Sequence, residues 1–298
     1  MNSNFITFIH SNLYVFRDDL YPFLGGGNKG RKMLYIIQDI ADKQCNAVVT
    51  TGGIQSNHCR ALAIVACQNK WKCSLVLHGE KERFYIESGN AKIIRMSGAK
   101  IIFVDDASLI SKAMDDEMVF YKDNGYNPYY VYGGGHTLRG GQAYIEAVKE
   151  LKDFCDKDNW YPDYIFLASG TGSTQSGILA GIDKYKLRTK VIGISVARKK
   201  ERAEVVVGEF YKKLCQEYNI EYLQNDVIVL DDYLCGGYEK FNPQIKELSN
   251  NSIREYGFTL DTTYTGKAFY GMLEYMKINE IRGNILFWHT GGIFNFLA

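Results

Sequence analysis

Residues 25–32 read GGGNKGRK and place Lys29 in a glycine-rich stretch, directly before a segment with a helical pattern. A lysine amine has an ordinary pKa of about 10.4, so it is mostly protonated and a poor nucleophile at neutral pH. Burial or a neighbouring cation, here Arg31 or Lys32, would lower that pKa and allow the amine to attack an aldehyde. Three interpretations stand: a solvated charge, an anion-binding residue, or a nucleophile.

A second stretch, SGTGSTQSG at 169–177, follows a strand-like run and opens a helical one. Gly170 and Gly172 let the backbone approach an anion, and the first amides of the helix are free to bind it. The hydroxyl residues of this loop are Thr171, Ser173 and Thr174. The loop therefore suits a single phosphate group, with a plain strand-to-helix turn as the alternative.

The same loop disfavours two other classes of phosphate ligand. A dinucleotide fold needs a third glycine, where this chain has Gln175, and an acidic residue after the next strand, which ends ISVARKK. The GK[ST] signature of a nucleoside-triphosphate loop is missing from the sequence as well. A reactive lysine together with a one-phosphate loop points to pyridoxal phosphate, which needs an amine for its aldehyde and a cup for its phosphate.

A third stretch, GGIQSNHCR at 52–60, places Ser56 and Asn57 at the expected start of a helix. Ser56 is a natural N-cap, and capping alone would explain it. In the functional interpretation, the same free amides bind a substrate carboxylate while the Asn57 amide binds another polar group. No histidine has triad or metal-ligand spacing, so packed, solvated and catalytic interpretations all remain open for His58, His136 and His289.

The elements that must position these stretches alternate along the chain. Continuous Val/Ile/Leu runs separated by helical patterns predict parallel strands covered on both faces, and therefore an α/β fold with open, parallel-rich sheets. Ligands bind outside the carboxyl ends of such strands, where this chain has glycines and hydroxyl residues. The expected strands are 46–53, 73–79, 99–106, 129–135, 164–172, 190–197, 226–232 and 284–292; the expected helices include 56–70, 142–156, 175–187, 201–219 and 244–256.

The composition bounds the class of protein. The 298 residues are 46% hydrophobic and 23% charged, which is typical of a soluble globular chain with one large domain or two that share a cleft. A formal net charge of +1 argues against nucleic acid as a partner. The expected location is the cytosol, because the first residues lack a signal-peptide pattern, no run is long enough to span a membrane, and seven scattered cysteines predict reduced thiols without a zinc site.

Five blocks in order carry a family resemblance: RDDLYPFLGGGNKGRKMLY, TTGGIQSNHCRA, ASGTGSTQSGILAG, LDTTYTGKAFYGM and HTGG. From about Tyr14 to Thr290, the chain resembles the pyridoxal-phosphate enzymes called 1-aminocyclopropane-1-carboxylate deaminase and D-cysteine desulfhydrase. The resemblance implies the two-domain fold of the tryptophan synthase β type (fold type II), bound pyridoxal 5'-phosphate and a homodimer. It implies a larger cofactor-binding domain of residues 1–43 and 138–298 and a smaller one of 44–137.

The resemblance also implies roles for individual residues. Lys29 matches the Schiff-base lysine, which also acts as the base, and Ser56 and Tyr264 match catalytic positions. Ser56, Asn57 and His58 match the substrate-binding positions. The positions implied to hold the cofactor are Lys29, Asn57, Gly170, Thr171, Gly172, Ser173, Thr174, Tyr264 and Thr290.

Two positions favour the desulfhydrase branch. The ring-opening deaminases have glutamate where this chain has Thr265, and glutamine where it has His58. A hydroxyl near the pyridine nitrogen would give a weaker electron sink than a carboxylate, which suffices when a good leaving group departs. The hypothesis is β-elimination from D-cysteine to pyruvate, sulfide and ammonia. The alternatives are the deaminase, action on another amino acid, and a cofactor-binding protein without activity; Gly30 and a His136 that enters the pocket would mark such a departure.

Overall fold

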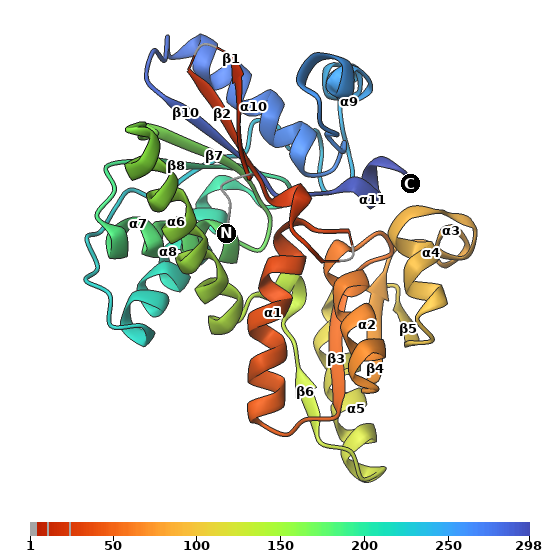
Figure 1. Cartoon of the computed structure of the whole chain (residues 1–298). Helices are drawn as coiled ribbons and strands as arrows, with labels where there is room; N and C mark the ends of the chain where they lie inside the picture. Colours follow the sequence, from red (N-terminus) through yellow and green to blue (C-terminus); the bar gives the residue numbers. More distant parts are fainter. Residues whose placement is uncertain (1–4, 11, 24) are drawn as a thin grey trace.

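The chain is built on two separate β-sheets, which Figure 1 shows as two lobes side by side. The computed structural model describes residues 5–10, 12–23 and 25–298; residues 1–4, 11 and 24 of the expected larger domain lie outside the described residues. The large lobe contains β1 (Ile6–His10), β2 (Leu13–Arg17), β7 (Tyr164–Ser169), β8 (Lys190–Ser195), β9 (Ile228–Leu230) and β10 (Ile285–His289); the small lobe contains β3 (Ala47–Gly53), β4 (Lys72–His78), β5 (Lys100–Val104) and β6 (Pro128–Tyr130).

The sheet of the large lobe has the strand order β1-β2-β10-β7-β8-β9. Its strands run parallel except β1, which pairs with β2 in an antiparallel hairpin that the sequence analysis did not predict. The apolar runs are buried on both faces, as expected for parallel strands. In β10, Leu286 and Trp288 face one core cluster while Ile285 and Phe287 face another.

The sheet of the small lobe has the order β5-β4-β3-β6, and all its neighbours are parallel. The strand expected at 129–135 ends at Tyr130. It ends there because Gly134 and Gly135 have left-handed φ values of 71° and 69°, and Gly133–Gly135 form a 3-10 turn (η3) instead. The other 3-10 turns of the described residues are η1 (Asp18–Leu20) and η2 (Ala107–Leu109).

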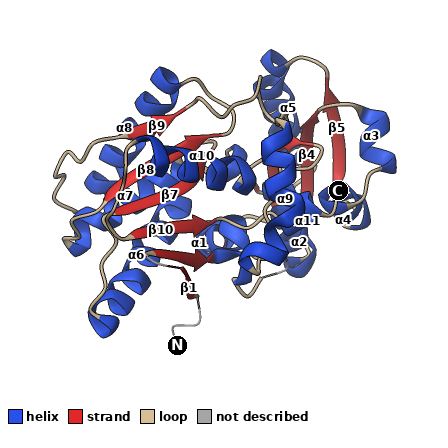
Figure 2. Ribbon diagram, turned by 90° about the horizontal axis from the view of Figure 1, so that it is seen from above, coloured by secondary structure: helices blue, strands red, loops and turns tan. Residues whose placement is uncertain are grey.

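Helices cover both faces of both sheets, as Figure 2 shows from above. In the large lobe, α6 (Leu138–Asp158), α7 (Ser173–Tyr185) and α8 (Lys200–Glu217) cover one face, and α9 (Pro243–Tyr256) and α10 (Thr265–Ile278) cover the other. In the small lobe, α1 (Gly27–Asp42), α2 (Asn57–Asn69) and α4 (Gly89–Met96) share one core cluster, and α5 (Ile110–Asp123) packs on the opposite face. The short helices α3 (Lys81–Ile86) and α11 (Ile293–Phe296) complete the described elements.

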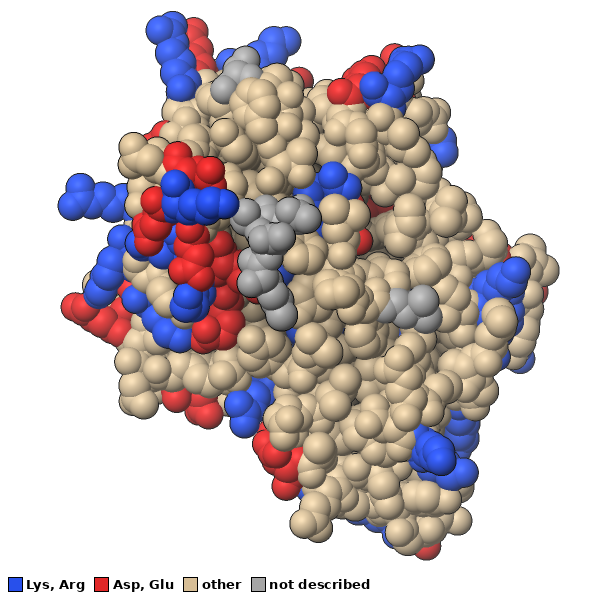
Figure 3. Space-filling model, in the orientation of Figure 1, with Lys and Arg blue, Asp and Glu red and all other residues tan. Residues whose placement is uncertain are grey.

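The surface agrees with the balanced charge of the sequence. On the face seen in Figure 3, side chains of both signs lie mainly around the edges, and neither sign dominates. Within the described residues, no helix combines the length and the apolar character that crossing a bilayer requires.

Candidate active site

A cavity of about 400 Å³ opens between the two lobes. It lies at the carboxyl ends of β3, β4, β7 and β10, where the rule for open α/β sheets places a ligand. The predicted site residues that line it are Lys29, Ser56, Asn57, His58, Gly170, Thr171, Gly172, Thr174, Tyr264 and Thr290. Ser173 does not line this cavity, because its side chain turns toward α1 below the loop.

Lys29 lies in the first turn of α1, and glycines hold that turn against β10. Gly27 has a left-handed φ of 76°, and a Cβ atom there would lie only 2.8 Å from the carbonyl oxygen of Thr290. The backbone amide of Asn28 donates a hydrogen bond of 2.9 Å to the same Thr290 oxygen. Glycine is therefore required for Lys29 to reach the cavity, where its Nζ donates to the Gly134 carbonyl at 3.0 Å.

Burial favours the neutral form of the Lys29 amine, which is its nucleophilic form. Loss of water contact lowers the pKa of Lys29 to about 8, and the nearby Cys59 thiol raises it only partly back. The Arg31 cation does not act as the sequence analysis expected, because its charge is neutralised by Asp18 and Glu150 on the far side of the helix.

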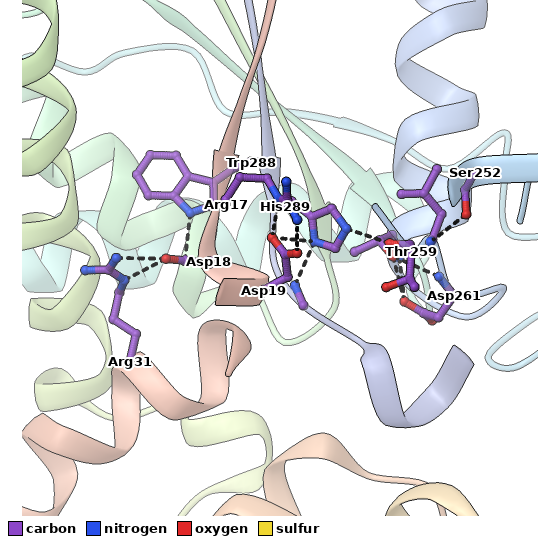
Figure 4. Close-up of polar contacts among 12 residues, drawn as sticks. Arg17, Asp18, Asp19, Arg31, Ser252, Thr259, Asp261, Trp288 and His289 are labelled. Atoms are coloured by element: carbon purple, nitrogen blue, oxygen red, sulfur yellow. Dashed lines mark hydrogen bonds and ion pairs between the residues drawn. The ribbon is translucent and has the colours of Figure 1, made fainter. Parts of the chain in front are cut away.

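The ion pair between Arg31 and Asp18 belongs to a buried network behind the site (Figure 4). The Arg31 guanidinium donates to Asp18 at 2.9 Å and to Glu150 at 2.7 Å. The Asp18 carboxylate also accepts from the Tyr144 hydroxyl and, at 2.8 Å, from the Trp288 indole. These bonds fix the first turns of α1 to β10 and α6, and so fix the origin of the Lys29 side chain.

The predicted anion loop connects β7 to α7. Gly172 has a left-handed φ of 92° and caps the helix, whose first amides are free by geometry. Below the loop, the buried Lys32 ammonium donates to Ser173 Oγ at 2.7 Å. No ion pair within 4 Å joins Lys32 to a carboxylate of the described residues, and burial and repulsion from Lys29 lower its pKa.

Those features together fit pyridoxal phosphate. A buried cation without a carboxylate partner, free helix amides and the Thr174 hydroxyl would compensate a phosphate group, and Lys29 offers an amine to the aldehyde from the same cavity. Asn28 ties the two ends together by donating to Thr174 Oγ1 at 3.2 Å. Lys32 was predicted only as a cation beside Lys29, although the i, i+3 spacing places both residues on one helix face.

Ser56, Asn57 and His58 begin α2 at the cavity wall. Ser56 Oγ accepts from the Cys59 amide at 3.2 Å, so its side chain is an N-cap, as the first interpretation held. Both polar atoms of the Asn57 side chain are bonded: Oδ1 accepts from Asn90 Nδ2 at 3.1 Å, and Nδ2 donates to Asn295 Oδ1. The Ser56 and Cys59 amides are committed to Gly53 and to Ser56 Oγ, so the backbone amides of Asn57 and His58 are the groups at this helix end that could bind a carboxylate.

The His58 ring is buried and points to β3. Thr50 Oγ1 gives its proton to the Val131 carbonyl at 2.7 Å, so His58 Nε2 must donate to Thr50 Oγ1 at 2.9 Å. Burial, followed by repulsion from Lys29 and Lys32, lowers the pKa of His58 well below its ordinary value and so favours the uncharged ring. The structure thus gives its imidazole a packing and hydrogen-bonding role rather than a charged contact with substrate.

His136 and His289, the other two histidines considered above, do not line this cavity. His136 lines a second cavity of about 550 Å³ instead of the main one, with its ring centre 4.0 Å from that of Phe210, so of the interpretations left open the structure favours a packed imidazole. Its burial lowers the pKa of His136 to about 4. His289 is fully buried, accepting from the Gly291 amide at Nδ1 and facing the Thr259 carbonyl at 2.7 Å through Nε2, as Figure 4 shows for Thr259.

Tyr264 lines the cavity together with Tyr238, which the sequence analysis missed. Their hydroxyl groups share a hydrogen bond, and burial raises the pKa of both tyrosines. Tyr238 comes from a loop anchored by Lys267, whose ammonium donates to the carbonyls of Leu234 at 3.0 Å and Gly237 at 2.9 Å. The loop has no repeated pattern or charge cluster that would have marked it in the sequence.

Thr265 does not line the cavity. Its hydroxyl donates to the buried Asp261 carboxylate at 2.8 Å, and that carboxylate also accepts from the backbone amides at 263, 264 and 265. The expectation that position 265 sets the electron sink is therefore not supported by its placement. Thr290 is the hydroxyl residue of this group that does line the cavity.

The comparisons with known proteins agree with this geometry. The family model of the pyridoxal-phosphate dependent enzymes matches residues 4–291. A protein of Thermotoga maritima, provisionally named 1-aminocyclopropane-1-carboxylate deaminase, is 34% identical over 96% of this chain and 90% of its own length. The D-cysteine desulfhydrase of Yersinia enterocolitica is 28% identical over 96% of this chain and 88% of its own.

The solved structures give the same result for the fold. The crystal structure of a homologue of 1-aminocyclopropane-1-carboxylate deaminase superimposes with a TM-score of 0.87 at 28% identity, covering 96% of this chain and 86% of its own. The predicted α/β fold of type II is therefore confirmed. The chain belongs to the pyridoxal-phosphate dependent enzymes, in the group that contains the 1-aminocyclopropane-1-carboxylate deaminases and the D-cysteine desulfhydrases.

Proposed function

We propose that the protein catalyses β-elimination from a small amino acid, with D-cysteine as the reference substrate. D-Cysteine and one water would give pyruvate, hydrogen sulfide and ammonia. The observation that carries the choice is the lining of the cavity, which among the described residues contains hydroxyls, amides and basic groups but no carboxylate. A ring without a carboxylate beside it is a moderate electron sink, which suits a substrate with a good leaving group.

The residues of the chain have distinct parts in this proposal. Bound pyridoxal phosphate supplies an aldehyde and an electron-withdrawing ring. The Asn57 backbone amide at the start of α2 holds the substrate carboxylate and orients its Cα–H bond, because the Ser56 amide already donates to the Gly53 carbonyl at 3.0 Å. The Lys29 amine, with its pKa near 8, takes the Cα proton, and the Tyr238–Tyr264 hydroxyl pair lies at the same cavity to meet the departing group.

We expect Lys32→Met to weaken cofactor binding while leaving the fold intact. The methionine chain fills a similar volume and removes a desolvated cation, so stability should not fall, but the phosphate loses a charge-assisted partner. The dissociation constant for pyridoxal phosphate should rise about tenfold or more. A titration followed by the cofactor's absorbance measures this, and an unchanged constant would remove Lys32 from the phosphate site.

A panel of amino acids tests the reaction itself. D- and L-cysteine, D- and L-serine and 1-aminocyclopropane-1-carboxylate are each incubated with the holoenzyme, and ammonia, sulfide and 2-keto acid are measured together. We expect equal amounts of pyruvate, sulfide and ammonia from D-cysteine. Ring opening would instead give a four-carbon 2-keto acid without sulfide and would favour the deaminase, the activity in the name of the Thermotoga relative. Release from none of them would contradict both.

Three features of organisation complete the proposal. We propose domains of 1–43 with 138–298 and of 44–137, because all four strands of the small lobe lie in 44–137; α1, however, packs Met33, Ile36 and Ile40 into the core cluster of the small lobe. A cytosolic location is supported by seven cysteines that are all free thiols.

A homodimer is proposed from the family resemblance. Analytical ultracentrifugation, which measures the mass of the protein in solution, would test it.

A further inference from the structure

Arg198 is a charged residue of the main cavity that the reaction described above does not use. Among the described residues that line this cavity, Lys29 and Arg198 supply the cations, and no aspartate or glutamate balances them. The neighbouring Lys199 and Lys200 have carboxylate partners at 3.6 Å and 3.9 Å, whereas no ion pair of the described residues includes Arg198. Burial and repulsion from Arg202 lower the pKa of Arg198, but an arginine keeps its charge in proteins. The cavity therefore contains a cation that is left for an anion.

The sheet of the large lobe places Arg198 beside the anion loop. Strands β7 and β8 are parallel neighbours, and Ser169 lies opposite Ser195 at their carboxyl ends (Figure 2). The buried Ser195 hydroxyl accepts from the Arg198 amide at 3.1 Å and donates to the Arg198 carbonyl at 2.5 Å. With its backbone fixed in this way, Arg198 donates from its guanidinium to the carbonyl of Gly170, the first residue of the loop.

This hydrogen bond decides which way the first peptide group of the loop faces. In a planar trans peptide, the carbonyl and the following N–H point in opposite directions. Because the Gly170 carbonyl is turned toward Arg198, the Thr171 N–H is turned away from Arg198. The carbonyls of Ser169 and Gly172 are engaged as well, since each accepts from a backbone amide of the large lobe.

The amides of the loop, by contrast, have no acceptor within the protein. No hydrogen bond of the described residues uses the N–H of Thr171 or Gly172, and the next amides, at 173–175 in the first turn of α7, are free by geometry. A run of free N–H groups binds an anion, whereas a carbonyl turned toward the same anion would repel it. The loop is therefore suited to phosphate only while the Gly170 carbonyl stays turned toward Arg198.

We infer that Arg198 is a positioning residue for the phosphate of the cofactor: it holds the Gly170 carbonyl so that the Thr171 amide is available to the phosphate. Its part differs from that of Lys32, which approaches the loop from below through the Ser173 side chain. The inference requires only that the protein bind pyridoxal phosphate, and it does not depend on which amino acid the enzyme acts on.

Cofactor binding to the full-length protein tests the inference. Cofactor-free protein is titrated with pyridoxal phosphate and with pyridoxal, which lacks the phosphate, and dissociation constants are taken from the absorbance. Arg198→Ala should raise the constant for pyridoxal phosphate about tenfold, the loss expected for one charge-assisted hydrogen bond, and leave that for pyridoxal unchanged. No change with pyridoxal phosphate, or an equal rise with both ligands, would overturn the inference.

Two further variants separate the hydrogen bond from charge and from general damage. Arg202→Ala removes an exposed cation of α8 that acts on Arg198 only through its charge, so its constants should stay within about twofold of the wild type. A rise equal to that of Arg198→Ala would reject the role of the Gly170 bond. Arg198→Lys keeps a charged donor and should bind pyridoxal phosphate more tightly than Arg198→Ala; equal constants would reject it too.

A spectroscopic readout on the holoenzyme completes the test. The phosphorus NMR signal of the bound cofactor should shift in Arg198→Ala and stay in place in Arg202→Ala, because only the first variant releases the loop. An unmoved signal in Arg198→Ala would overturn the inference. Since these measurements record binding and not turnover, failure of the amino-acid panel would reject the proposed elimination and leave the role of Arg198 standing.

Discussion

Lys29→Ala should lower turnover by about three to four orders of magnitude, the size of effect typical of losing a general base. It should also remove the near-visible absorbance that pyridoxal phosphate acquires when an amine holds it. Both changes have the same physical origin, because Lys29 presents the buried amine in a cavity that also contains the anion loop. Absorbance spectra and steady-state rates on the same preparation measure the two effects.

The control for Lys29 is a lysine outside the site. Lys92→Ala, on the exposed side of α4, should leave spectrum and rate unchanged. Lys29→Arg keeps a cation at the cavity but cannot react with an aldehyde at neutral pH, so it should resemble Lys29→Ala. Full activity in either Lys29 variant would end the assignment of this residue.

Asp18→Ala should destabilise the fold by about 3 kcal/mol, near the lower end of what breaking a buried ion pair costs. The Asp18 side chain is fully buried and accepts from Arg31, Tyr144 and Trp288. Its removal leaves three buried donors short of an acceptor, and only the half-exposed Glu150 remains to balance Arg31. Urea unfolding followed by circular dichroism measures the change in the free energy of unfolding.

A surface ion pair provides the comparison for Asp18. Asp116 pairs with Lys112 at 2.6 Å on α5, with both side chains well exposed. Asp116→Ala should cost no more than about 1 kcal/mol, because solvent screens that pair. Equal losses in the two variants would show that the buried network does not hold α1 more firmly than the solvent-exposed pair holds α5.

The position of the cavity could be predicted from the sequence because the residues at the strand ends are of a recognisable type. Glycine and hydroxyl residues at 52–57 and 169–174 follow buried apolar runs, and parallel strands bring such ends to one edge. Likewise, the three glycines before Lys29 are needed for local backbone reasons that a sequence displays. These features depend on neighbours in the chain, so they could be predicted.

Side-chain directions could not be predicted, because partners distant in sequence set them. His58 turns to Thr50 since the Thr50 proton is committed to Val131, 81 residues away. Thr265 turns to Asp261, and the loop of Tyr238 depends on a buried Lys267. The β1–β2 hairpin was not predicted either, because each of its strands has only five residues and β1 has no fully buried residue to mark it as a strand.

Helix α1 belongs mechanically to both halves of the molecule. Its first turns are tied to the large lobe through Asn28 and Arg31, while Met33, Ile36 and Ile40 are embedded in the small one. Because one continuous helix is anchored in both lobes, a substitution that loosens Met33, Ile36 or Ile40 in the small lobe would also loosen the turn that carries Lys29.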